Sequence, residues 1–166
     1  MKDLAELIAT VARVGYMRPA SGTWGSAAAV PLLWALHEVG GFLAVLVGTV
    51  VVFVAGLWAT QELTRGAEDH DPSEIVVDEV VGQWIALWPV SLGAQMMGVE
   101  SLALWPGWIA AFVFFRLFDI WKPLWIGKAD RRGDAMGVML DDVIAGVFAA
   151  AVVVALAGLS HGVVMR

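Results

Sequence analysis

Hydrophobic residues along the chain form five long runs that are separated by short polar segments. The runs cover residues 24–36, 42–59, 80–97, 102–118 and 143–159. Most of them approach the roughly 18 residues that a helix needs to cross a bilayer, and the first is the shortest. The pattern therefore predicts an all-α fold, an integral membrane helical bundle with about five membrane-embedded helices in a single domain over residues 1–166.

The N-terminal segment, residues 1–20, has a different pattern. Its apolar residues recur at helical spacing on one face and are Leu4, Leu7, Ile8, Val11 and Val14. Charged residues occupy the other faces, so we expect an amphipathic interfacial helix followed by an entry loop. A short helix packed on its own bundle is the alternative. The charges leave no clean apolar stretch for a signal peptide, and we expect none.

Proline and glutamine residues inside two of the runs modify this picture. Pro31 lies in the first run and predicts a kink or a partly re-entrant segment. Gln83 and Gln95 lie in the third run. One side of that helix is therefore expected to face protein or water instead of lipid, because an amide is costly to bury without partners.

Charged residues gather in three segments, residues 1–23, 61–79 and 116–142. These hold nine of the ten Lys and Arg and fourteen of the sixteen carboxylates. If the five runs cross the bilayer in order, all three segments emerge on one face, and the positive-inside rule places that face in the cytoplasm. We therefore expect residues 61–79 and 116–142 to form active-site loops on the cytoplasmic side.

Composition agrees with a membrane protein and excludes some functions. Hydrophobic residues make up 60% of the chain and the mean hydropathy is +0.78, well above the usual range for globular proteins. The net charge of −6 argues against a nucleic-acid partner, which would require a basic surface. The absence of cysteine excludes disulfides and thiolate metal sites.

Two pairs of acids stand directly before apolar runs. Asp78 and Glu79 precede the third run, and Asp141 and Asp142 precede the fifth. Helix capping explains one acidic pair, because a carboxylate is stabilised by the free N–H groups and the dipole of a helix start. Two pairs at one membrane face weaken that explanation, because one side chain per helix is enough to cap it.

Asp119 is harder to explain by capping. It lies at the C-terminal end of the fourth run, where the helix dipole opposes an anion. Arg116 and Lys122 lie three residues to either side, so the three side chains share one helical face. A local ion-pair ladder is one interpretation. The other is a site in which Asp119 binds metal and the two cations hold a phosphate.

Five carboxylates at one face would repel one another unless a cation joined them. They are Asp78, Glu79, Asp119, Asp141 and Asp142. Hard oxygen ligands without cysteine favour Mg²⁺ or a similar ion. Because Mg²⁺ in proteins is usually shared between carboxylates and substrate phosphate oxygens, acids beside Arg and Lys predict phosphate chemistry.

Two further segments carry weaker signals. Gly22, Thr23 and Ser26 lead into the first run, where glycine permits close backbone approach and N–H groups at a helix start bind an anion. A flexible entry with a Ser or Thr cap is the alternative. His70 lies between two aspartates and is a candidate catalytic residue, although a solvated loop histidine has the same pattern.

Four ordered blocks contain most of these residues. They are Gly22-Thr23-Trp24-Gly25-Ser26, His70-Asp71 with Ile75-Val76-Val77-Asp78-Glu79, Phe115-Arg116-Leu117-Phe118-Asp119-Ile120-Trp121-Lys122-Pro123, and Gly137-Val138-Met139-Leu140-Asp141-Asp142-Val143-Ile144-Ala145-Gly146. Together they resemble the phosphatidylglycerophosphatase A family of small membrane lipid phosphatases, over about residues 18–146. Ser21 and Trp125 stand where the family often has proline, which affects loop shape more than charge.

The resemblance implies a multi-pass hydrolase of the bacterial cytoplasmic membrane, with its active site on the cytoplasmic face. The implied reaction is Mg²⁺-dependent removal of the terminal phosphate of phosphatidylglycerophosphate, a step of phospholipid biosynthesis that gives phosphatidylglycerol. The five carboxylates are then expected to hold the metal, and the catalytic residues to be Asp78, Glu79, Asp119, Asp142 and His70. Arg116, Lys122, Gly22, Thr23 and Ser26 are expected to bind the substrate.

Two reaction mechanisms are compatible with these residues. In one, the metal lowers the pKa of a bound water, and a carboxylate takes a proton from this water as the water attacks phosphorus. In the other, an aspartate attacks phosphorus and an aspartyl-phosphate forms.

Another lipid phosphate or a polyprenyl phosphate is an alternative substrate. A cation or proton transporter is less favoured, because no chain of ionisable residues crosses the apolar runs. We also expect a homodimer, because five short helices shield a wet site poorly.

Overall fold

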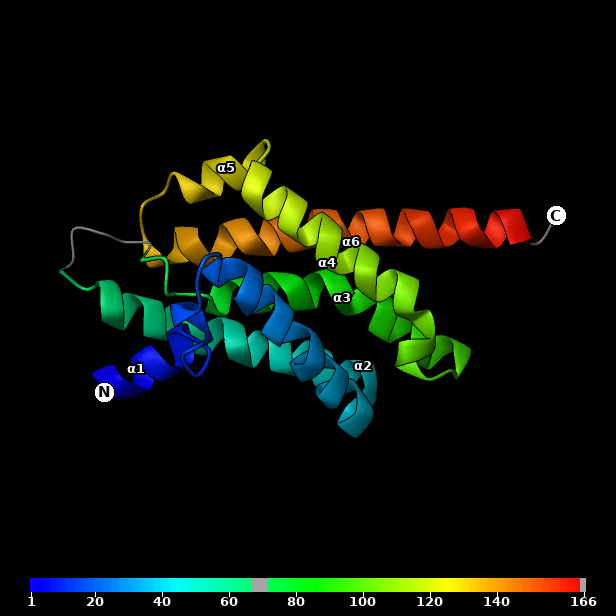
Figure 1. Cartoon of the computed structure of the whole chain (residues 1–166), viewed down its shortest axis with the longest axis horizontal. Coiled ribbons are helices and arrows are strands. Elements are labelled where there is room, and N and C mark those ends of the chain that lie inside the picture. Colours follow the sequence, from blue (N-terminus) through cyan, green and yellow to red (C-terminus); the bar gives the residue numbers. More distant parts are fainter. Residues whose placement is uncertain (67–71, 165–166) are drawn as a thin grey trace.

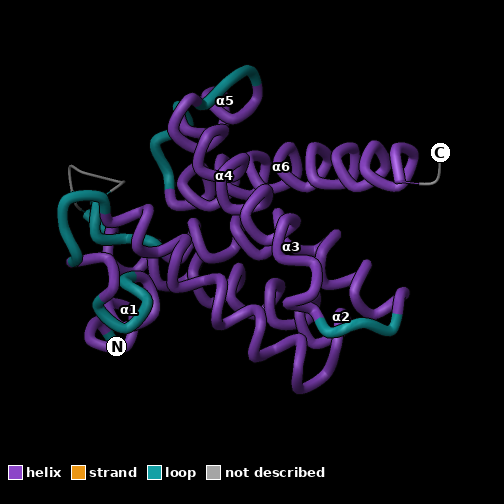
Figure 2. Tube along the Cα trace, turned by 45° about the vertical axis from the view of Figure 1, so that its right-hand side comes forward, coloured by secondary structure: helices purple, strands orange, loops and turns teal. Residues whose placement is uncertain are grey.

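The computed structural model describes residues 1–66 and 72–164. The elements in chain order are α1 (Lys2–Ala9), η1 (Val14–Tyr16), α2 (Ser21–Thr64), α3 (Val77–Met97), η2 (Ser101–Leu104), α4 (Trp105–Trp121), α5 (Trp125–Asp130) and α6 (Ala135–Val164). Short loops join these helices (Figure 2), and no strand occurs in the described ranges. The prediction of an all-α fold is therefore confirmed.

Helix α2 consists of two arms that meet at Gly40 and Gly41. These two glycines have non-helical torsions, with φ +63° at Gly41, a left-handed value that glycine adopts without steric cost. Figure 1 shows the second arm returning alongside the first towards the end of the bundle where α2 begins. At Pro31, where we expected a kink, the torsions stay helical, and the break of α2 lies at Gly40 and Gly41 instead.

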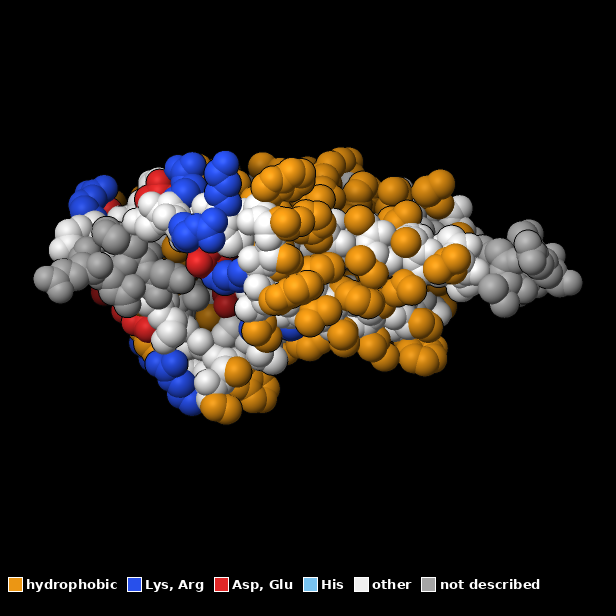
Figure 3. Space-filling model, turned by 90° about the horizontal axis from the view of Figure 1, so that it is seen from above, with side chains coloured by type: hydrophobic (Ala, Val, Ile, Leu, Met, Phe, Trp, Pro, Cys, Tyr) orange, Lys and Arg blue, Asp and Glu red, His pale blue; other side chains and the backbone are white. Residues whose placement is uncertain are grey.

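Three helical stretches are long and apolar enough to cross a membrane. They are α2, residues Ser101–Trp121 and residues Ala135–Ser160. Figure 3 shows the exposed hydrophobic side chains as a broad belt, with the charged side chains gathered at one end of the molecule. This separation is typical of a protein that lies in a bilayer with one charged end in water.

Helix α3 is the centre of the bundle. It packs against both arms of α2, and against α4 and α6. Nearly every residue from Val77 to Leu87 is buried, as expected for a helix that is apolar on all sides. Gln83 is fully buried, and Gln95 accepts a hydrogen bond from the N–H of Phe42. Gln83 therefore faces protein, as predicted, whereas Gln95 is exposed and bonds to the backbone at the bend of α2.

Helices α3 and α6 make close backbone contact at Gly82 of α3 and Gly146 of α6. A Cβ atom added to Gly146 would lie 2.4 Å from the Gly82 carbonyl oxygen, and one added to Gly82 would lie 2.4 Å from the Phe115 ring. Such distances exclude any side chain, so only glycine permits α3, α4 and α6 to approach this closely.

The functional segments are more helical than we predicted. Residues 61–79 and 116–142 were expected as loops, but α2 continues to Thr64, α3 begins at Val77 and α6 begins at Ala135. Capping is therefore the wrong explanation for Asp141 and Asp142, which lie well inside α6. The helix extends past them because its first turns bury apolar side chains such as Met139 against the bundle.

Helix α1 packs on the bundle through small residues. Ala5 and Ala9 are fully buried, whereas Leu4 and Leu7 are exposed. The Ala9 carbonyl accepts a hydrogen bond from the N–H of Val76, just before α3. The alternative of a helix packed on its own bundle is thus correct for the alanine face, and the exposed leucines remain available for contact with lipid.

Candidate active site

Three carboxylates meet where the start of α3 lies beside the second turn of α6. Asp78, Glu79 and Asp142 each place an oxygen within 4.8 Å of the other two. Asp78 is 7% exposed and Asp142 is 2% exposed. Glu79 Oε2 and Asp142 Oδ2 are buried without a hydrogen-bond partner among the described residues. Carboxylates packed this closely destabilise one another, so the cluster fits a bound cation.

The glycine contact between α3 and α6 brings this cluster together. Asp78 precedes Gly82 by four residues, and Asp142 precedes Gly146 by four residues. Side chains four residues apart lie one above the other on a helix face. Because the two backbones touch at the glycines, the two aspartates one turn earlier are held next to each other.

Gly22 at the start of α2 lies against the third carboxylate. A Cβ atom at this position would be 2.2 Å from Glu79 Oε1 and 3.2 Å from Arg116 Nη1. The close backbone approach predicted for Gly22 is therefore present, and its partner is the acidic cluster. The segment itself is helical from Ser21, so the alternative of a flexible entry is wrong.

Arg116 is held beside the cluster by two hydrogen bonds. Its Nη1 donates to Asp119 Oδ2 at 2.5 Å and to Ser26 Oγ at 3.4 Å. Ser26 in turn donates to the Gly22 carbonyl at 2.9 Å. The negative charge of Asp119 also lies near Asp142. Arg116 therefore places a fixed positive charge next to the buried acids.

Lys122 takes a different position from the one that its spacing predicts. Its Nζ donates to Asp141 Oδ2 at 2.8 Å and to Asp130, not to Asp119. The reason is that α4 ends at Trp121 and Lys122 has a left-handed φ of +48°, so its side chain leaves the helical face. The predicted ladder is correct for Arg116 and Asp119 only.

The environment of Lys122 keeps it charged. Burial would lower the pKa of this lysine, but hydrogen bonds with Asp130 and Asp141 raise it above its usual range. Asp141 is directed to this ammonium group, while its Oδ1 accepts from the Asp142 N–H at 2.9 Å. Among the five predicted metal ligands, three therefore cluster, Asp119 lies beside them, and Asp141 binds Lys122.

The remaining predicted residues divide into two groups. Thr23 lies half-buried in the first turn of α2, on the same turn as Gly22. The first N–H groups of a helix have no acceptor within it, so this turn can bind an anion. His70 falls in residues 67–71, outside the described residues.

Two polar residues of the site were not predicted. Asp130 binds Lys122 from α5, and nothing in its local pattern indicates this contact. Gln83 lies one turn beyond Glu79, fully buried, and neither of its amide atoms has a hydrogen-bond partner among the described residues. The four-residue spacing from Glu79 is the signal that places Gln83 next to the acidic cluster.

The chain is similar in sequence to several known proteins. The family model described as phosphatidylglycerophosphatase A matches residues 7–157. A protein of Bacteroides thetaiotaomicron named "Putative phosphatidylinositol-3-phosphatase" is 40% identical over 150 residues, which cover 87% of this chain and 88% of the relative. Proteins named phosphatidylglycerophosphatase A are similar as well. The one from Haemophilus influenzae is 37% identical, covering 86% of this chain and 82% of its own length.

The relative from Escherichia coli K12, also named phosphatidylglycerophosphatase A, is 34% identical over 140 residues, which cover 79% of this chain and 70% of the relative. No solved structure matches. The matched region contains α2 to α5 and most of α6, and with them every residue of the acidic cluster. The chain is therefore a phosphoric monoester hydrolase and belongs to the phosphatidylglycerophosphatase A family.

Proposed function

We propose that this protein removes the terminal phosphate of phosphatidylglycerophosphate and releases phosphatidylglycerol. The observation that carries the proposal is the buried cluster of Asp78, Glu79 and Asp142 with the Arg116 guanidinium beside it. An acidic metal site next to a fixed cation is the arrangement that hydrolysis of a phosphoric monoester needs. The names of two relatives supply the lipid.

The cluster fits Mg²⁺ because all of its donor atoms are hard carboxylate oxygens. The two unpartnered oxygens, on Glu79 and Asp142, support the same assignment. Asp78, Glu79 and Asp142 would hold the ion, with Asp119 alongside. Bound there, Mg²⁺ supplies Lewis-acid chemistry, which lowers the pKa of water and offsets negative charge on the phosphate.

The residues of the chain orient the substrate for this reaction. Arg116, fixed by Asp119 and Ser26, binds the phosphate oxygens through its planar guanidinium. The free N–H groups at the start of α2 add donors. A carboxylate accepts a proton from the attacking water. The new bond joins the water oxygen to phosphorus, and the bond that breaks joins phosphorus to the lipid oxygen. That oxygen takes up the proton that the carboxylate accepted and leaves as the glycerol hydroxyl.

The topology follows from the same proposal. Five helical segments cross the bilayer: the two arms of α2, then α3, α4 and α6. The charged end in Figure 3 faces the cytoplasm, so that the headgroup enters from the membrane surface while the acyl chains stay in lipid. The homodimer stays a prediction, which light scattering of the detergent-solubilised protein tests.

Phosphate release from purified protein in mixed micelles tests the proposed reaction. We expect release from phosphatidylglycerophosphate with Mg²⁺ and at least a roughly 10²-fold loss with EDTA, reversed when Mg²⁺ is added back. Phosphatidic acid and a polyprenyl phosphate serve as comparison substrates and are expected to be poorer. Metal-independent release, or none from any lipid phosphate, would refute the proposal.

A second substrate is favoured by the name of the Bacteroides relative. Phosphatidylinositol 3-phosphate carries a monoester phosphate on a diacylglycerol lipid, so the same cluster and the same guanidinium suit it. It therefore belongs in the assay as a separate arm. A higher kcat/KM on this lipid than on phosphatidylglycerophosphate would assign the protein to inositol lipids.

Replacing Lys122 with Gln is expected to lower kcat/KM by about 10- to 100-fold, the scale of one charge-assisted hydrogen bond. The substitution removes a cation from the mouth of the site and leaves the buried carboxylate of Asp141 without its partner. Lys128→Gln is the matched control, because Lys128 is an exposed lysine on α5 and should keep near-normal activity. Equal activity of the two variants would contradict a role for Lys122.

A further inference from the structure

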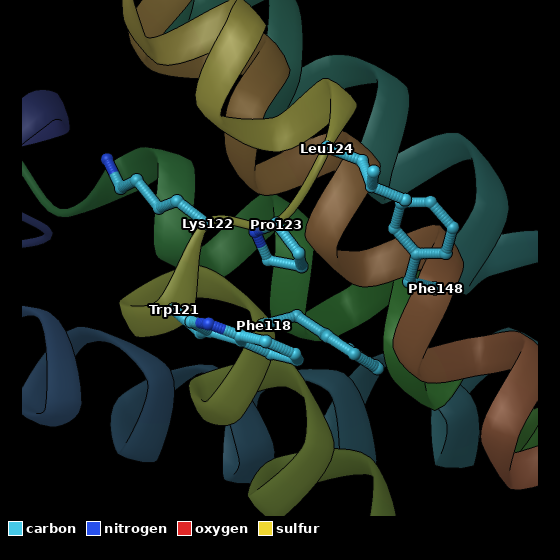
Figure 4. Close-up of a pocket in the computed structure, with 6 residues that line it drawn as sticks. All are labelled: Phe118, Trp121, Lys122, Pro123, Leu124 and Phe148. Carbon is cyan, nitrogen blue, oxygen red and sulfur yellow. The ribbon is translucent and has the colours of Figure 1, made fainter.

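An apolar groove lies next to the candidate active site, where the end of α4, the start of α5 and α6 meet. Its volume is about 550 Å³, and it is lined by Phe118, Trp121, Lys122, Pro123, Leu124 and Phe148 (Figure 4). All of these residues except Lys122 are apolar. The volume is in the range of about 300–1,000 Å³ that is typical of small-molecule sites.

Lys122 connects this groove to the acidic site. In Figure 4 its side chain points away from Leu124 and Phe148, and its Nζ binds Asp141 and Asp130. Phe118 also lines the groove, and the next residue in the sequence is Asp119. The last turn of α4 therefore presents an apolar ring to the groove and a carboxylate to the site, so the two are adjacent.

The backbone between α4 and α5 is shaped to separate these two environments. Lys122 and Leu124 both have a left-handed φ, +48° and +51°, which is uncommon for residues other than glycine. Pro123 between them has its φ fixed by its ring. Alternate residues of this short segment consequently point in different directions, Lys122 to the acids and Leu124 to the groove.

The surface around the groove is apolar and exposed. Trp121 is 70% exposed, Leu124 is 80% exposed and Trp125 is 67% exposed. Tryptophan side chains are common where a membrane protein meets the headgroup region. The end of α4 and α5 lie at the end of the bundle where α3 and α6 begin (Figure 1), where the apolar belt gives way to charge (Figure 3). The groove thus opens to lipid.

We propose that this groove holds an acyl chain of the lipid whose phosphate is bound at the acidic site. The inference rests on the proposed function and adds to it the recognition of the hydrocarbon part. The anionic headgroup would lie beside the positive charge of Lys122, and the acyl chain would lie along the apolar rings of Phe118 and Phe148. Each part of the lipid therefore matches the polarity of the surface that it contacts. The substrate class is therefore a phosphate monoester on a long-chain lipid, and free headgroup phosphates are poor substrates.

Two substrates that differ only in their acyl chains test this inference. We compare long-chain phosphatidylglycerophosphate with its deacylated headgroup, at fixed detergent concentration. Wild-type protein should prefer the long-chain lipid in kcat/KM. Leu124→Asn, which places a polar group in the groove and suits a left-handed φ, should lower kcat/KM on the lipid about tenfold, chiefly through KM. Its activity on the headgroup should stay within about twofold of wild type.

Ile120→Asn is the matched control, because Ile120 is 71% exposed on α4 but does not line the groove. It should leave both activities near wild type. Phe148→Ala, from the opposite wall, should reproduce the selective loss on the lipid. Retained turnover of the headgroup by each variant shows that the active site is folded.

Three results would overturn the inference. One is a wild-type protein that hydrolyses both substrates with equal kcat/KM. Another is Leu124→Asn lowering both activities equally. The third is a change in the oligomeric state of the Leu124→Asn variant, measured by light scattering, together with a lower kcat/KM on both substrates. That result would assign the groove to a contact between subunits. Absence of phosphate release from either substrate by wild type refutes the proposed function instead.

Discussion

Asp142→Asn is expected to lower kcat on phosphatidylglycerophosphate by about 10²- to 10³-fold, the scale of losing one preorganised electrostatic group. Asp142 is 2% exposed, and its Oδ2 has no hydrogen-bond partner among the described residues. Asparagine has nearly the same shape but lacks the negative charge, so the cluster with Asp78 and Glu79 binds a divalent cation more weakly.

The same substitution should leave the protein folded. It removes one of three closely packed carboxylates, and this relieves repulsion in the metal-free protein. We therefore expect an unchanged or higher melting temperature in detergent with EDTA, and a higher Mg²⁺ concentration for half-maximal activity. Asp134→Asn is the control, because Asp134 is exposed and pairs with Arg132. A variant of Asp142 that keeps a tenth of wild-type activity would exclude it as a ligand.

The helices themselves were largely predictable from hydrophobicity. The five apolar runs correspond to the two arms of α2 and to α3, α4 and α6. The ends of these helices do not follow from hydrophobicity, because a charged residue does not by itself end a helix. In this bundle a charged residue marks the end of an apolar stretch, while the helix continues. Asp141 and Asp142 lie inside α6 for this reason, with buried apolar residues before and after them.

The sequence predicts which residues belong to the site better than it predicts how they are arranged in space. Sequence spacing identified Asp78, Glu79 and Asp142 as acids at one end, but their convergence depends on the contact between Gly82 and Gly146. That contact joins residues 64 positions apart, so no local pattern contains it.

The position of Lys122 follows from a local signal, the proline that comes after it. The spacing from Arg116 assumes a continuous helix, whereas the residue before a proline is disfavoured in helical geometry. Pro123 therefore predicts the end of α4 at this point, and the structure has it there, with Lys122 as the first residue beyond the helix.

Gly146→Val is expected to destabilise the protein by about 2–3 kcal/mol, the scale of overpacking a close contact. Even a Cβ atom at this position would lie 2.4 Å from the carbonyl oxygen of Gly82, so α6 must move away from α3. Because Asp142 lies one turn before Gly146, this movement separates it from Asp78. A displacement of about 1 Å at a catalytic group can lower kcat about 10²-fold.

Gly158→Val on the same helix is the matched control, since a Cβ atom there would meet nothing within 4 Å. Unfolding in detergent, followed by tryptophan fluorescence, measures the stability of both variants, and phosphate release measures their activity. Gly146→Val should lower both quantities and Gly158→Val neither. If the Gly146 variant lost stability but kept full activity per folded molecule, the acidic cluster would not depend on this contact, and the positioning of Asp142 by the glycine pair would be wrong.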